Sequence, residues 1–180
     1  MMRWIAVLAL AGLFLAPSVS AASFTLSSPD FRAGGTISLP HEANSAGCHG
    51  ANVAPRLMWS GPPMATRGFA LTVVDPDAPK AIAPTGFTHW VAYNIPATWR
   101  HMYGNAPTGT TSGANGAGLR GYLGPCPPLH DHLHHYYYYT VYALDVASVG
   151  PAGLRRDALL RAMTGHVLAT TQLVGTFQRP

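Results

Sequence analysis

Acidic, imidazole and phenol side chains stand beside several apolar runs of the sequence. Asp75 directly follows the apolar run 69–74, His89 lies inside the next apolar run, and His135 opens a long segment rich in Tyr, Thr and Val. Tyr137 shares the face of His135, because alternate residues of a strand point the same way. These groups could donate hydrogen bonds to an anion and carry a charge that changes with pH. We therefore predict that the four side chains converge at one edge of a sheet and bind an anion.

Simpler interpretations exist for each of these residues. Asp and Pro are ordinary turn residues, and an ordinary turn explains Asp77 better than Asp75, which is closer to the buried run. A single histidine in a strand is more often a core residue with a satisfied hydrogen bond than a ligand. The Gly-Pro segment 121–128 precedes His135 and could expose backbone N–H groups as a concave anion nest.

A histidine-rich segment offers a second kind of chemistry, namely metal binding. It contains His130, Asp131, His132, His134 and His135. Imidazole suits Zn, Cu and Ni. Alternate residues of an extended segment point to opposite faces, however, so a solvated turn is the favoured interpretation and we assign no metal ligand. An exported metal-binding protein remains an alternative.

The sequence has no G-x-S-x-G, HExxH or P-loop motif. Asp and His can act as general acids and bases, but without a nucleophile they favour binding over turnover. We therefore expect neither an enzyme nor a cofactor.

These side chains must be positioned by short strands. Strand-like runs occur at 24–27, 36–39, 57–60, 69–74, 88–95, 136–144 and 173–177. Apolar residues recur with helical spacing only from Leu154 to Val167. With 19 Gly and 16 Pro, long helical bundles are excluded, and no linker divides the chain. The sequence predicts one mainly β, antiparallel domain over 22–180 with a C-terminal helix.

The start of the chain is typical of a signal peptide. Arg3 precedes an apolar stretch from Ile5 to Leu15, Pro17 follows, and small residues surround Ala21. The apolar stretch is shorter than the about 20 residues that a membrane-spanning helix needs. We predict a signal peptide over 1–21, with cleavage after Ala22 as the alternative, and export to a periplasm or beyond.

Charge and cysteine content fit an exported binding protein. The formal net charge is +4, but the arginines are scattered, which argues against a nucleic-acid partner. Cys48 and Cys126 are the two cysteines. In an oxidising compartment they most simply form one disulfide, and a metal-binding pair is the weaker option.

In combination, the motifs resemble the phosphatidylethanolamine-binding proteins (PEBPs), and in particular their bacterial Raf-kinase-inhibitor-like branch. The matching stretches spread over most of the chain after residue 21: 47–55 (GCHGANVAP), 57–61 (LMWSG), 75–79 (DPDAP), 86–90 (GFTHW) with 94–96 (NIP), 121–128 (GYLGPCPP) and 140–145 (TVYALD). The resemblance implies a large antiparallel sheet packed on a smaller one, with helical segments near the C-terminus.

The resemblance also implies a small pocket for phosphate-like or other anionic head groups, including that of a lipid. Its residues would be Asp75, His89, the loop wall of Gly124, Cys126 and Pro127, then His135 and Tyr137, with Pro79 and Phe87 as an apolar rim. The family's G-x-H-R-Y segment matches imperfectly, because Tyr136 replaces the usual Arg. His134 would take the place of His135 if the strand slipped by one residue, which reverses every side chain.

Partner proteins are the remaining hypothesis. Eukaryotic relatives in this family regulate kinases or peptidases, so the resemblance raises a partner protein or a secreted enzyme to be inhibited as alternatives. An exported bacterial protein would not meet a cytosolic kinase.

Overall fold

Two antiparallel sheets form the framework of the protein. The structure, a computed structural model, describes residues 23–104, 108–130 and 132–179. The predicted signal peptide and Asp131 lie outside them. The smaller sheet has the order β1 (Thr25–Ser27), β2 (Leu57–Ser60), β5 (His101–Met102). The larger has the order β6 (Thr111–Ser112), β4 (Phe87–Pro96), β3 (Gly68–Asp75), β7 (His135–Leu144), β8 (Val167–Phe177). The predicted fold class is confirmed.

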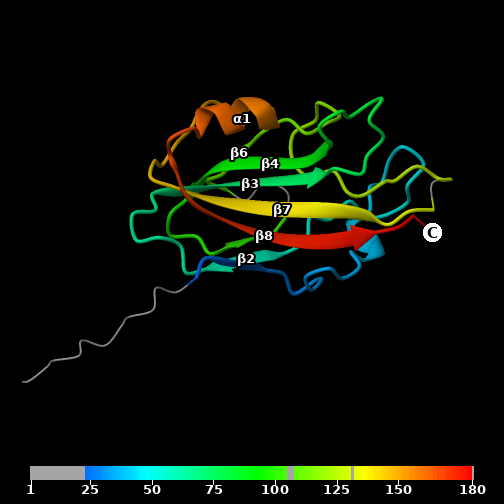
Figure 1. Cartoon of the computed structure of the whole chain (residues 1–180), viewed down its shortest axis with the longest axis horizontal. Helices are drawn as coiled ribbons and strands as arrows, with labels where there is room; N and C mark the ends of the chain where they lie inside the picture. Colours follow the sequence, from blue (N-terminus) through cyan, green and yellow to red (C-terminus); the bar gives the residue numbers. More distant parts are fainter. Residues whose placement is uncertain (1–22, 105–107, 131, 180) are drawn as a thin grey trace, which may run out of the picture.

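The main core lies between the two sheets. Figure 1 shows the large sheet in the middle, with helix α1 (Arg156–Ala162) above it and β2 of the small sheet below. Central strand β3 is buried along nearly its whole length, as its continuous apolar run predicts. Phe69 packs edge-on against Trp59 of β2, with 5.3 Å between ring centroids. This contact joins the two sheets.

The C-terminal helix is shorter than its periodicity predicts. Helix α1 ends at Ala162, and Val167 belongs to β8, which begins there rather than at Leu173. Gly165 has φ +81°, a left-handed conformation that ends a helix. Leu159 and Met163 of this segment are buried in a second core cluster on the outer face of the large sheet.

A second difference concerns the expected strand over 36–39. Thr36 makes only an isolated bridge to Thr176, and Leu39–His41 form a 3₁₀ helix, η1. Pro40 has no backbone N–H to give to a sheet, which explains why a strand cannot continue there. Strands β5 and β6 have two residues each and carry no pattern that could have predicted them.

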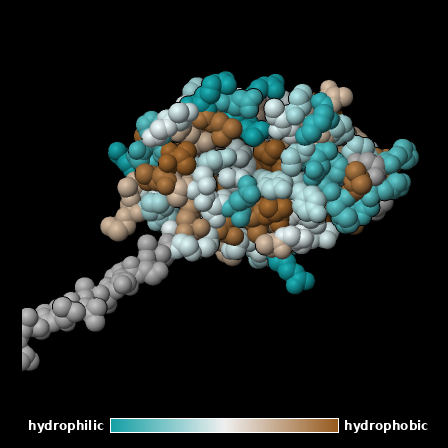
Figure 2. Space-filling model, in the orientation of Figure 1, coloured by the Kyte–Doolittle hydropathy of each residue, from teal (hydrophilic) through white to brown (hydrophobic). Residues whose placement is uncertain are grey.

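One end of the large sheet gathers the connecting segments. On the right of Figure 1, β3 and β8 end, the 43–52 segment loops back, and the C-terminus lies close by. On the face shown in Figure 2, hydrophobic side chains form separate brown patches among white and teal ones. Among the described residues, no helix is long and apolar enough to cross a membrane.

Candidate functional site

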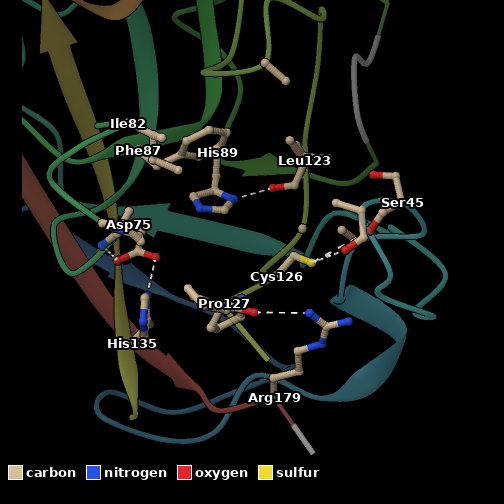
Figure 3. A pocket seen from close by; sticks show the side chains of 17 residues that line it. Ser45, Asp75, Ile82, Phe87, His89, Leu123, Cys126, Pro127, His135 and Arg179 are labelled. Carbon is tan, nitrogen blue, oxygen red and sulfur yellow. Dashed lines mark hydrogen bonds and ion pairs between the residues drawn. The ribbon is translucent and has the colours of Figure 1, made fainter. Parts of the chain in front are cut away.

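A cavity of about 370 Å³ opens at this end of the large sheet. Its walls come from the end of β3, the starts of β4 and β7, three loops and the C-terminal segment (Figure 3). The lining residues are Ala43, Ser45, Ala46, Asp75, Ala78, Pro79, Ile82, Phe87, His89, Ala117, Leu123, Gly124, Cys126, Pro127, Pro128, His135 and Arg179. Most of these side chains are apolar, so the few polar ones decide what the cavity can recognise.

Asp75 and His135 form a buried pair on one side of the cavity. Nδ1–H of His135 donates to Oδ2 of Asp75 at 2.7 Å, and the two residues are only 2% and 3% exposed. Oδ1 of Asp75 accepts the backbone N–H groups of Asp77 and Ala78 at 2.8 and 3.1 Å. A buried carboxylate needs such partners, so the DPDA turn folds back onto the side chain of its own first residue. The pair can hold a positive charge on His135 against the carboxylate.

His89 presents a free ring nitrogen to the cavity. Its Nδ1–H donates to the backbone carbonyl of Leu123 at 2.7 Å, which fixes the tautomer, because a carbonyl can only accept. Nε2 has no hydrogen bond to a described residue. Burial lowers the pKa of His89, and the carbonyls of Leu123 and Gly124 and the Asp75 charge offset this only in part. His89 is therefore neutral at pH 7 and offers an acceptor, which becomes a donor on protonation.

Tyr137 packs against His89 and is not one of the residues that line the cavity. The rings of His89 and Tyr137 meet edge-on with 5.0 Å between centroids, and Phe87 contacts the other side of His89 at 4.9 Å. Tyr137 is buried but does not line the cavity, and its hydroxyl has no hydrogen bond to a described residue. Burial, followed by the Asp75 charge, raises the pKa of its phenol. Tyr137 thus positions His89 and holds its phenol proton, and a direct contact between Tyr137 and a ligand stays a prediction.

The register of β7 decides between the two candidate histidines. His135 pairs with Phe177 of β8 and is buried, whereas His134 is exposed. Exposed Asp77 accepts the backbone N–H of Tyr136 at 2.9 Å, which ties the turn after β3 to the start of β7. His135, not His134, therefore faces the cavity.

The Gly-Pro loop forms a wall, as predicted, but not as an N–H nest at Gly124. Gly124 donates its N–H to Oδ1 of Asn52 at 2.8 Å, so this group is not available to a ligand. A Cβ on Gly124 would lie 2.2 Å from the carbonyl oxygen of His41, which is why glycine is needed there. Cys48 and Cys126 form the predicted disulfide, with 5.9 Å between their Cα atoms. The bond fixes this wall against the 43–48 loop.

Several lining residues were not predicted from the sequence, and Ser45, Ile82 and Arg179 are among them. Arg179 donates to the carbonyls of Gly47 and, at 3.4 Å, of Pro127. Nothing in its local sequence indicates this role, because only the pairing of β8 with β7 brings the C-terminal segment to the cavity.

The histidine-rich segment forms no metal site among the described residues. His130, His132 and His134 are exposed, and no group of three or more His, Cys, Asp or Glu side chains in the described ranges is arranged to hold a metal ion. Its remaining member, Asp131, is outside those ranges.

Comparison with known protein families shows which family has this architecture. The family model described as phosphatidylethanolamine-binding protein matches residues 27–178. The chain belongs to the phosphatidylethanolamine-binding protein family. It is 34% identical over 174 residues to the UPF0098 protein YbcL of Escherichia coli K12, covering 92% of this chain and 93% of that protein. A UPF0098 protein of Chlamydia trachomatis is 38% identical over 133 residues, covering 73% of this chain and 87% of its own.

One solved structure and a third relative extend the comparison. The crystal structure of E. coli YbcL, described as a new member of the mammalian PEBP family, superposes with a TM-score of 0.80. It is 33% identical and covers 88% of this chain and 100% of its own. Mycobacterium tuberculosis LppC, whose name carries the word lipoprotein, is 37% identical over 163 residues, covering 90% of this chain and 76% of its own. The PEBP resemblance inferred from the motifs is confirmed.

Proposed function

We propose that this PEBP-family protein is an exported binding protein whose cavity holds a phosphate-like or other anionic head group. The observation that carries the proposal is the meeting of the Asp75–His135 pair with the free Nε2 of His89 in one cavity of about 370 Å³. The two imidazoles come from β4 and β7, and each is oriented by a hydrogen bond at Nδ1. Orientation before binding reduces the entropy lost when a ligand arrives.

The histidines would contact the charged part of a ligand, and the apolar walls would contact its uncharged part. His135, held by the Asp75 carboxylate, can carry a positive charge, and His89 can gain one by taking up a proton. Pro79, Ile82 and Phe87 line the apolar side and would contact the uncharged part of an organic ligand.

Without a nucleophile motif, we propose binding rather than turnover. A panel of phosphatase and esterase substrates should give no activity that depends on Asp75.

Export is the second part of the proposal. The signal-peptide pattern over 1–21, the Cys48–Cys126 disulfide and the name of LppC support a periplasmic or secreted protein. Fractionation of cells that produce the full chain should recover the protein outside the cytoplasm and without residues 1–21. Regulation of a partner protein, if it is part of the function, should appear as capture of a periplasmic protein that depends on added anion.

Calorimetric titration of inorganic phosphate and of phosphoethanolamine tests the binding proposal. The wild-type protein should bind, and His89→Ala should lose at least about tenfold in affinity, because the hydrogen bond between Nε2 of His89 and the charged probe is lost. His101→Ala is the matched control, since His101 is an exposed histidine on β5 of the other sheet. Equal affinities for wild type and His89→Ala, or no binding of either probe by wild type, would contradict the proposal.

A further inference from the structure

We infer that Arg179 supplies the positive charge by which the cavity attracts an anion, while Asp75, His135 and His89 form a floor without net positive charge that orients it. This inference rests on the proposed function and names the residue that determines its preference for negative charge. It concerns the C-terminal segment beyond β8, which the sequence motifs do not reach.

The floor of the cavity offers no net positive charge from its described residues. The Asp75 carboxylate lies 2.7 Å from Nδ1 of His135, so it offsets any positive charge that His135 carries. His89 is buried with a free acceptor at Nε2, so it adds no charge at neutral pH. An anion held by the floor alone would therefore lie beside a buried carboxylate, which is electrostatically unfavourable.

Arg179 is the one lysine or arginine among the described residues that line the cavity. Its guanidinium donates to the carbonyls of Gly47 and Pro127, which are uncharged acceptors. No described carboxylate forms an ion pair with it. Since a guanidinium has five N–H donors, about three remain for a ligand, and no carboxylate of the described residues neutralises its charge.

The fold holds Arg179 in place without a ligand. Phe177, opposite His135 in the β7–β8 register, brings the chain out of the sheet next to the cavity. Gly47 has φ +76°, and a Cβ there would lie 3.1 Å from Nη2 of Arg179. The guanidinium thus spans the loops on both sides of the Cys48–Cys126 bond. In Figure 3 it lies below the middle of the view with its guanidinium directed at Pro127, while Asp75 lies on the left.

The test is calorimetric titration of inorganic phosphate into wild type, Arg179→Gln, Arg179→Lys and the control Arg161→Gln. Arg161 is an exposed arginine on α1, away from the cavity lining. Each titration is run at about 0.1 M and about 1 M salt, between which the Debye length falls from about 10 Å to about 3 Å. We expect Arg179→Gln to lose at least about tenfold in affinity at the lower salt. Arg179→Lys should keep most of the affinity, and Arg161→Gln should behave as wild type.

The salt dependence separates a charge role from a purely structural one. If Arg179 attracts the anion, Arg179→Gln should bind with nearly the same affinity at both salt concentrations, while wild type weakens. Loss of affinity with an unchanged salt dependence would mean that Arg179 only holds the loops, and would overturn the inference. Wild-type affinity in Arg179→Gln would overturn it while leaving the binding proposal intact, whereas no phosphate binding by wild type would remove both.

Discussion

Replacing Cys48 and Cys126 by serine should lower the free energy of unfolding by about 4 kcal/mol. The disulfide joins residues 78 positions apart. For a loop of that length the chain-entropy relation gives about 15 cal/mol/K, or about 4.5 kcal/mol at 25 °C, and measured values often fall somewhat below it. In a domain of this size each kcal/mol corresponds to about 2–4 °C, so the midpoint of thermal unfolding should fall by about 8–16 °C.

Circular dichroism during heating measures this effect. Wild-type protein treated with a reducing agent is the matched control and should unfold at the temperature of the double variant. The same samples should bind phosphate more weakly, because the Gly124–Pro128 wall would have to become ordered on binding. A fall of less than about 3 °C, well below the expected range, would show that other contacts between the two loops suffice. Unchanged phosphate affinity would show that the bond does not shape the cavity.

Three further predictions concern the site and its supporting loop. Because burial lowers the pKa of His89, the unfolded chain binds more protons, so stability should rise with pH up to about 6.5 and fall on acidification by up to about 1.4 kcal/mol per pH unit. The groups that face His89 are Asp75 of β3 and His135 and Tyr137 of β7. In urea unfolding, the free energy of unfolding of His89→Phe should depend less steeply on pH than that of wild type. Equal pH slopes for the two proteins would refute the assignment of this pH dependence to His89. Asp75→Asn should cost about 3–5 kcal/mol in the same assay, because it leaves His135 without its charged partner, whereas Asp77→Asn at the exposed position should cost far less. Gly124→Ala should destabilise by about 1–3 kcal/mol or more, since its Cβ meets backbone atoms at 2.2 Å; an unchanged unfolding midpoint would show that the loop can move away.

The positions of the site residues that lie at strand ends could be predicted from the sequence. The continuous apolar run before Asp75 predicts a buried central strand, and the period of two in β7 places His135 and Tyr137 on one face. The period of two predicts which face of the sheet a side chain lies on, but it does not predict whether that side chain reaches the cavity. Tyr137 lies one pair further into the sheet, so it packs behind His89 instead of lining the cavity.

Long-range features lay beyond the sequence pattern. The helical periodicity from Leu154 ran on to Val167 because apolar residues there also serve strand β8, and the local pattern cannot separate the two uses. The Gly-Pro segment 121–128 was expected to expose backbone N–H groups, but the N–H of Gly124 donates to Asn52, which is 72 positions away. Arg179 reaches the cavity only through the pairing of β8 with β7, so no local motif could indicate it.

The central claim is that an anion binds at the imidazoles of His89 and His135. Nitrogen-15 NMR of the histidine side chains during phosphate titration, with chloride at equal ionic strength as the control, tests it most directly. The account predicts that phosphate, but not chloride, shifts the Nε2 signal of His89 toward the protonated imidazole and perturbs His135, while His101 and His134 stay unchanged. Phosphate that moves the exposed histidines and leaves His89 and His135 unaffected would contradict it.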